Sequence, residues 1–285
     1  MTVEQRILDV SVVRQAVAQL VVQANCCIGE GMLTCLERCR DREEKDLSRN
    51  VLDMIVRNDR LAEERMVAMC QDTGMAIFRV QVGQEICFIG GSLEQAIQDG
   101  TAQGYADGYL RKSVVSDPLF DRTNTRDNTP AIIYYEMIPG DQIHITFAPK
   151  GFGSENMSAI KMLKPADGVD GVLDFVVDTV KKAGPNPCPP IVVGVGIGGT
   201  FEKAAQLSKF ALMRDVGSHN TDTRYAALEE ELMARINALD IGPAGLGGGT
   251  TALGVHVEWF PTHIAGLPVA VNICCHAYRH GSVTL

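Results

Sequence analysis

Three cysteines of this 285-residue chain lie beside polar residues at the ends of apolar segments, where a thiol packed in a core is not expected. Cys70 opens the stretch CQDTG, directly before an apolar run. Cys188 lies in NPCPP, whose three prolines restrict the backbone and remove amide donors. The pair Cys274-Cys275 ends another apolar run and precedes histidines and an arginine, so either of its thiols could be the third candidate. These positions make the three thiols candidates for metal ligands.

Three isolated thiolates could together hold a metal ion or an iron–sulfur cluster. A four-iron cluster with only three cysteine ligands would leave one iron open, as a catalytic zinc site keeps one open position. The alternative is that each is a structural thiol, because cysteine is among the most buried residue types. The sequence has no C-x-x-C pair, which argues against a zinc ribbon or a thioredoxin-like motif. Cys35, Cys39 and Cys87 are expected to be packed thiols within a helix and a strand.

Basic side chains occur near the same segments. Arg111 and Lys112 follow a predicted helix, Lys150 precedes GFGSEN, and Arg279 follows the last cysteines. Any one of them is typical of a surface charge. An arginine at the mouth of a loop is also what a dicarboxylate site requires, because the guanidinium binds a carboxylate through two hydrogen bonds.

The histidines leave several interpretations open. His144 and His256 fall in predicted strands and are expected to face a polar pocket or solvent. His263, in a loop after a proline and a threonine, could reach a binding site or a partner chain.

Bulk properties limit the classes of function. A net charge of −9 disfavours general attraction to nucleic acid or to an anionic membrane surface. No signal peptide or apolar run of membrane-spanning length is expected. The nine cysteines are therefore predicted to be mostly reduced thiols in a cytoplasmic protein.

Apolar periodicity predicts the elements that position these residues. Residues 1–66 are predicted to be mainly helical, and an amphipathic helix over residues 1–24 has an apolar stripe of Val3, Ile7, Val10, Val17 and Val21. Residues 67–285 are predicted to be mixed α/β and to carry the cysteine loops, with a hairpin around Pro139–Asp141. Further strands are predicted over 75–83, 85–91, 191–199, 252–260 and 268–275, and helices over 92–112, 171–184, 200–212 and 225–239. No internal repeat is visible, so the prediction is one compact α/β domain over residues 1–285.

A glycine pattern, Gly194-x-Gly196-x-x-Gly199, follows an apolar strand and precedes a helix, as in dinucleotide-binding proteins. The rest of that unit is absent, because the next element is another helix and not a strand ending in an acid. The sequence therefore predicts a tight strand-to-helix turn in a fold that is not a Rossmann fold.

Taken together, these stretches resemble the iron–sulfur (class I) fumarase family, which includes the L-tartrate dehydratases. The motifs that carry the resemblance, in chain order, are CQDTG, RKSVVSDPL, PKGFGSENMSAIKMLKP, NPCPPIVVGVGIGGT, IGPAGLGGGTTALGVHVE and CCHAYRHG. The similarity spans nearly the whole chain and is that of the alpha subunit of a two-chain enzyme. It implies a 4Fe-4S cluster on Cys70, Cys188 and Cys275, with one open iron acting as a Lewis acid.

The same resemblance implies roles for other residues. Gln71, Asp72, Arg111 and Gly153 would contact a dicarboxylate substrate, and Asp72 would assist a base on a beta subunit that carries the rest of the active site. His263 would reach into the site of a neighbouring subunit in a homodimer of alpha chains.

Fumarate hydration is the favoured activity, because GFGSENMSAIK resembles the two-chain fumarases. L-Tartrate dehydration is the alternative within the family. A metal-binding or redox-sensing protein without catalytic activity is the alternative of another class.

Overall fold

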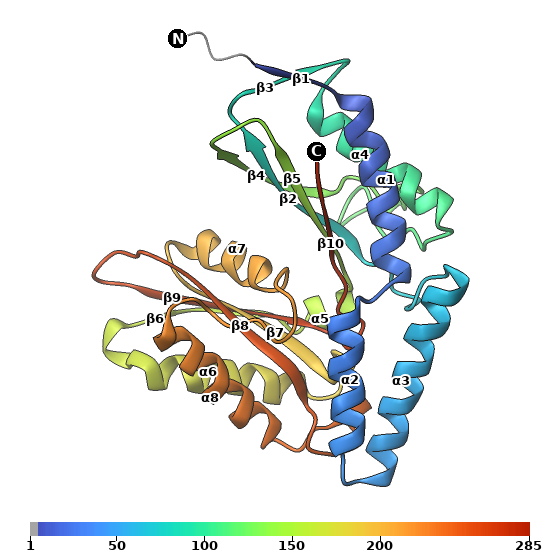
Figure 1. The fold of residues 1–285 in the computed structure, drawn as a ribbon. Helices are drawn as coiled ribbons and strands as arrows, with labels where there is room; N and C mark the ends of the chain where they lie inside the picture. Colours follow the sequence, from blue (N-terminus) through green and yellow to red (C-terminus); the bar gives the residue numbers. More distant parts are fainter. Residues whose placement is uncertain (1–4) are drawn as a thin grey trace. The chain divides into compact units, whose positions relative to one another are not determined.

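The structure is a computed structural model that describes residues 5–285. It divides into two compact units (Figure 1). The first unit comprises Met1–Ile28, Asp59–Gly151 and Arg279–Leu285, and the second comprises Gly29–Asn58 and Phe152–Tyr278. The mixed α/β fold class is confirmed. Whether both units form the single predicted domain stays a prediction.

The first unit is built on a four-stranded sheet of order β10-β5-β2-β4. Its core includes the fully buried Phe78, Phe147 and Tyr105. A separate parallel pair joins β1 to β3. The elements are β1 (Arg6–Asp9), α1 (Val10–Cys26), β2 (Met75–Gly83), β3 (Ile86–Ile89), α4 (Leu93–Asp107), β4 (Ile132–Ile138), β5 (Ile143–Lys150) and β10 (Gly281–Thr284).

The second unit is built on a four-stranded sheet of order β6-β9-β7-β8. Helix α7 covers one face of this sheet, and α6 and α8 lie on the other (Figure 1). Helix α3 begins in this unit and ends in the first. The elements are α2 (Glu30–Arg42), α3 (Asp46–Arg65), α5 (Phe152–Glu155), β6 (Ala159–Leu163), α6 (Gly168–Ala183), β7 (Ile191–Gly198), α7 (Phe201–Ala211), α8 (Thr223–Asn237), β8 (Ala252–Phe260) and β9 (Leu267–Cys274), with short 3₁₀ turns at Pro165–Asp167 and Pro243–Gly245.

The two sheets share one strand arrangement, although the sequence shows no repeat. In each, a central strand (β2 or β7) has a parallel neighbour on one side (β4 or β8) and an antiparallel neighbour on the other (β5 or β9). A further antiparallel strand, β10 or β6, pairs with that second neighbour.

The predicted hairpin around Pro139–Asp141 is wrong in its pairing. Both strands form, but β2 lies between them, so β4 and β5 are not hydrogen-bonded neighbours. The connecting turn wraps around the end of β2 at Gly83, whose N–H donates to the Gln142 carbonyl at 2.8 Å. A side chain on Gly83 would lie 2.4 Å from the Gly140 carbonyl oxygen, so only glycine permits this close crossing. The alternation within β5 is confirmed by the complete burial of Ile143, Ile145 and Phe147.

The N-terminal helix begins later than predicted. Asp9 caps α1, because its carboxylate accepts a hydrogen bond from the Ser11 N–H at 2.8 Å. Ile7 therefore lies in strand β1 and is 66% exposed, whereas Val10, Val17 and Val21 form the buried stripe as expected. Val3 lies outside the described residues.

By length and composition alone, one helical segment of the described chain, Val10–Arg42, could cross a membrane, contrary to the prediction. This is weak support for a membrane span, because a buried core helix passes the same test. Within α1, Val13, Val17 and Val21 are fully buried against the strands of the first unit. That burial is typical of a core helix.

The glycine pattern in β7 and the turn that follows it acts in packing. A side chain on Gly196 would lie 2.0 Å from the Ala204 carbonyl oxygen, and one on Gly194 would lie 2.3 Å from the Ser208 carbonyl oxygen. These glycines let α7 approach β7 closely. The next element is α8, as predicted, and no second strand with an acidic end follows α7 directly.

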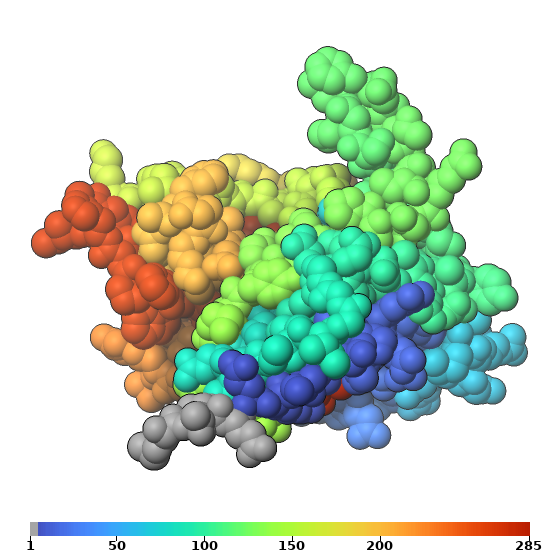
Figure 2. All heavy atoms as spheres, turned by 90° about the horizontal axis from the view of Figure 1, so that it is seen from above, coloured from blue at the N-terminus to red at the C-terminus, as the bar shows by residue number. Residues whose placement is uncertain are grey.

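A narrow arm, residues 114–125, stands out from the first unit (Figure 2, green). Two backbone hydrogen bonds join its sides, from Ser116 N to the Thr123 carbonyl at 2.8 Å and from Thr125 N to the Val114 carbonyl at 3.0 Å. Its tip presents Leu119 and Phe120, which are 71% and 82% exposed. The arm thus carries a defined apolar tip.

Candidate functional site

Buried polar side chains hold the backbone of the CQDTG loop of the first unit through hydrogen bonds. The Tyr105 hydroxyl donates to the Thr73 carbonyl at 2.7 Å, and the Asn128 amide donates to the Gly74 carbonyl at 3.0 Å. Burial raises the pKa of Tyr105 above its usual value, so the hydroxyl stays a donor at neutral pH. Gly74 has a φ of 72° and packs against the Lys150 backbone, which leaves no room for a side chain. The loop is therefore held in one conformation.

Asp72 is oriented within this loop. Its Oδ1 accepts a hydrogen bond from the Gly74 N–H at 3.0 Å, and its Oδ2 lies beside Gly151, where an added Cβ would be 3.1 Å away. The buried Arg279 donates to the Asp72 carbonyl at 2.6 Å and to the Asn25 side chain at 3.2 Å. The backbone of Asp72 is thereby tied to helix α1, and its carboxylate is half-buried.

Arg111 is anchored to the same loop by its backbone. Its carbonyl accepts a hydrogen bond from the Thr73 hydroxyl at 2.7 Å. Its side chain is exposed and, within residues 5–285, makes no hydrogen bond or ion pair. Gln71, Asp72 and Arg111 thus belong to one unit, and the exposed Arg111 side chain is available to an anion.

The second unit brings two of the predicted cysteine ligands near each other. The Cys188 carbonyl accepts a hydrogen bond from the His276 N–H at 3.3 Å, so the NPCPP turn lies against the segment that follows Cys275. Cys188 has a φ of 54° and an exposed side chain, and Cys275 is half-buried. Gly153 lies in α5 near Asn186. A Cβ built on Gly153 would be 3.7 Å from the Asn186 carbonyl oxygen. The predicted substrate contact at Gly153 therefore neighbours the Cys188 turn.

Within residues 5–285, no group of three or more His, Cys, Asp or Glu side chains is arranged to hold a metal ion. The predicted ligands belong to different units, with Cys70 in the first and Cys188 and Cys275 in the second. None of the nine cysteines, all of which lie in the described range, forms a disulfide. Three thiols on loops are the donor set that an iron–sulfur cluster uses, so the residue types fit this group. The ligand set itself stays a prediction.

His263 is exposed in the loop between β8 and β9. Its Nδ1 accepts a hydrogen bond from the Ala265 N–H at 3.2 Å, and the neighbouring Ile264 is 92% exposed. The role of His263 in a neighbouring subunit stays a prediction.

The remaining cysteines and histidines give mixed outcomes. Cys35 and Cys39 are half-buried in α2, and a hydrogen bond between the thiols lowers the pKa of Cys35 and raises that of Cys39. The expectation of a packed thiol is wrong for Cys87, which points to solvent from the short strand β3. His256 is buried and contacts the Ala211 carbonyl at 3.1 Å, whereas His144 bonds to the Thr284 hydroxyl at 2.7 Å.

Several supporting residues were missed or undervalued by sequence reasoning, namely Asn25, Tyr105, Asn128 and Arg279. The sequence allows Arg279 to be a surface charge or part of a dicarboxylate site, but it is only 4% exposed and supports the CQDTG loop. Buried polar residues of this kind carry no local sequence signal, because their partners are distant in the chain.

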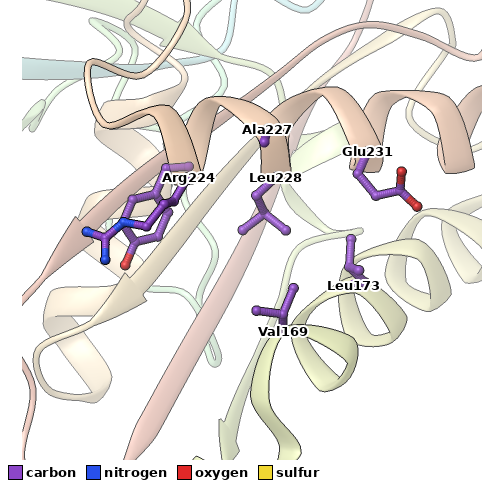
Figure 3. Close-up of a pocket in the computed structure, with 7 residues that line it drawn as sticks. Val169, Leu173, Arg224, Ala227, Leu228 and Glu231 are labelled. Atoms are coloured by element: carbon purple, nitrogen blue, oxygen red, sulfur yellow. The ribbon is translucent and has the colours of Figure 1, made fainter.

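An apolar pocket of about 400 Å³ lies between α6 and α8 of the second unit (Figure 3). It is lined by Val169, Leu173, Arg224, Tyr225, Ala227, Leu228 and Glu231. None of the predicted site residues lines it, so this pocket and the candidate site are different places.

Comparison with known proteins decides the family. The sequence model of the family described as fumarate hydratase (Fumerase) matches residues 14–284. The chain belongs to this family. It is 41% identical over 275 residues to a Methanocaldococcus jannaschii protein described provisionally as an L(+)-tartrate dehydratase alpha subunit, covering 94% of this chain and 95% of that protein. It is 31% identical over 276 residues to the L(+)-tartrate dehydratase alpha subunit of Escherichia coli K12, covering 94% and 89%. The family membership that the sequence motifs predict is thus confirmed.

Proposed function

We propose that this chain is the alpha subunit of an iron–sulfur fumarate hydratase, a hydro-lyase that reversibly adds water to fumarate to give L-malate. The observation that carries the proposal is the fixed CQDTG loop. It orients the Asp72 carboxylate through Gly74 and bonds to the backbone of Arg111, whose exposed guanidinium forms no hydrogen bond or ion pair within residues 5–285. An acid and an arginine in one rigid setting suit a dianionic substrate that gains and loses a proton.

Cys70, Cys188 and Cys275 are proposed to hold a 4Fe-4S cluster. When bound, it supplies an iron without a cysteine ligand that acts as a Lewis acid toward the substrate. The residues of this chain supply the rest. Arg111 binds a carboxylate of the substrate through its two-pronged guanidinium. Asp72 accepts a hydrogen bond from the group on the partner chain that acts as the base. This hydrogen bond increases the basicity of that group.

The proposal includes a beta subunit that completes the active site. The exposed Leu119 and Phe120 at the tip of the arm support a partner, because well-packed interfaces centre on buried apolar and aromatic anchors. Their arm begins three residues after Arg111, close to the proposed substrate contacts. The alpha chains are also proposed to form a homodimer with His263 near its seam, in a cytoplasmic heterotetramer.

L-Tartrate dehydration is a second candidate, favoured by the names of the relatives at 41% and 31% identity. The stretch GFGSENMSAIK, which contains Gly153, supports fumarate. The test is to measure kcat/KM for fumarate, L-malate and L-tartrate with one preparation of the complete enzyme. A preference for fumarate and L-malate is expected, and a preference for L-tartrate would replace the first candidate by the second.

Asp72→Asn is expected to lower kcat by roughly 10²-fold or more, the usual scale of acid–base assistance. The amide keeps the shape of the carboxylate and its contact with Gly74 while it removes the charge. The iron content should stay unchanged. The measurement is kcat in the complete enzyme beside an iron assay, and full kcat in the variant would reduce Asp72 to a cap of its own loop.

A further inference from the structure

A partly buried ion pair includes the residue at the end of the turn that carries Gly153. Lys209 of α7 donates to both carboxylate oxygens of Glu155, at 2.6 and 2.7 Å. The side chains of Lys209 and Glu155 are 12% and 28% exposed, so the pair is largely removed from water. Glu155 is the last residue of α5, a single turn that begins one residue before Gly153.

The same carboxylate is also bonded to the central part of the sheet. The Asn272 amide, on strand β9, donates to Glu155 at 3.0 Å and to the Ser158 hydroxyl at 3.0 Å. Asn272 is 4% exposed and lies three residues before Cys275. One carboxylate therefore joins helix α7, strand β9 and the α5 turn.

From this geometry we infer that Lys209 and Asn272 are positioning residues that hold Glu155 and, with it, the turn bearing Gly153. Lys209 also neutralises a carboxylate next to the place where a dianion is proposed to bind. Without Lys209, Glu155 would lose the cation that contacts both of its carboxylate oxygens, and the added negative charge would disfavour an anionic substrate. This inference rests on the proposed function for its substrate, but not for the contacts themselves.

Two variants distinguish the effect of an unpaired charge on the turn from the effect of a changed side-chain shape. Lys209→Met removes the cation and leaves Glu155 charged. The double variant Glu155→Gln with Lys209→Met removes both charges, and the new amide can still accept a hydrogen bond from Asn272. Lys45→Met is the matched control, because Lys45 forms a comparable ion pair with Asp240 in the same unit at 2.8 Å, but on the surface at 52% exposure.

The first measurement needs no activity. Hydrogen–deuterium exchange of the peptide covering residues 152–158 is compared in the full-length chain and its variants. In Lys209→Met, exchange at the α5 turn is expected to be about tenfold faster than in the unaltered chain, because the turn opens locally more often. The double variant should stay within about threefold of the unaltered chain, and Lys45→Met should match it.

The second measurement is kinetic and uses the complete enzyme. Lys209→Met is expected to raise KM for fumarate about tenfold, with kcat changed less than about threefold, since substrate binding is weakened more than the chemical step. The double variant should recover most of the KM. Added salt should lower the KM of the single variant, because salt screens the repulsion.

Unchanged exchange at residues 152–158 in Lys209→Met would overturn the inference, as would a double variant that exchanges as fast as the single one. If Lys209→Met does not fold, Glu155→Gln alone replaces it, and the same exchange increase is expected. A complete enzyme that neither hydrates fumarate nor dehydrates L-tartrate would contradict the proposed function. The exchange comparison would still decide whether Lys209 and Asn272 hold Glu155 in place.

Discussion

Arg111→Met is expected to lower kcat/KM for fumarate by roughly 10²- to 10³-fold, the effect of losing a charge-assisted pair in a desolvated site. The prediction follows from the exposed guanidinium and from the Thr73 hydrogen bond, at 2.7 Å, that ties the backbone of Arg111 to the CQDTG loop. The side chain is exposed and forms no hydrogen bond or ion pair in the part of the chain that the structure describes, so iron content and thermal stability should be retained. Steady-state kinetics of the complete enzyme, together with an iron assay, make the measurement.

Two variants control this experiment. Arg111→Lys keeps the charge but loses the two-pronged geometry, so an intermediate loss is expected. Arg122→Met removes an arginine of the arm whose guanidinium bonds to the Pro118 carbonyl at 2.5 Å, and it should not change substrate handling. If Arg111→Met has an unchanged kcat/KM, Arg111 lies outside the substrate site.

Replacing any one of Cys70, Cys188 and Cys275 by serine is expected to abolish cluster binding, and with it all activity. Serine keeps the size of the side chain but is a poor substitute for a thiolate, and a cluster held by three cysteines has no spare ligand. Iron and sulfide analysis after anaerobic reconstitution, with the absorbance of the cluster, gives the readout.

The other cysteines provide matched controls. Cys35, Cys39 and Cys87 lie on α2 and β3, and their serine variants should bind iron normally. Cys274 is the sharpest control, because it is adjacent to Cys275 but buried in the strand. Loss of the cluster in Cys274→Ser and its retention in Cys275→Ser would show that the ligand assignment is wrong.

Local patterns predicted most of the elements. The alternation in β5, the continuous apolar run of β7 and the glycine that ends α6 at Gly184 are properties of neighbouring residues, so they can be recognised from the sequence. The apolar stripe predicts too early a start for α1, because the cap at Asp9, and not the stripe, sets where the helix begins.

Strand pairing was not predictable in the same way. The insertion of β2 between β4 and β5 depends on contacts between segments far apart in the chain, and a short turn such as Pro139–Asp141 favours the simpler hairpin. Strand β10 was missed because its four residues carry no apolar run and depend on pairing with β5. The shared arrangement of the two sheets is a property of topology and leaves no visible sequence repeat.

In the candidate site, too, some residues could be predicted from the sequence and others could not. Residues that meet solvent or substrate, such as Asp72 and Arg111, stand out because their residue types are unusual for their surroundings. The groups that hold them, such as Tyr105, Asn128 and Arg279, are buried and far away in sequence, and only the structure brings them beneath the loop. The roles of the cysteines and of His263 came from family resemblance and stay predictions.

The most direct test of a two-chain iron–sulfur hydratase is fumarate hydration by this chain, reconstituted anaerobically, with and without its beta subunit. The predicted result is about four irons per alpha chain, negligible loss of fumarate absorbance by the alpha chain alone, and robust hydration when the beta chain is added. Rapid hydration by the alpha chain alone, or an active complex that contains no iron, would contradict the proposal.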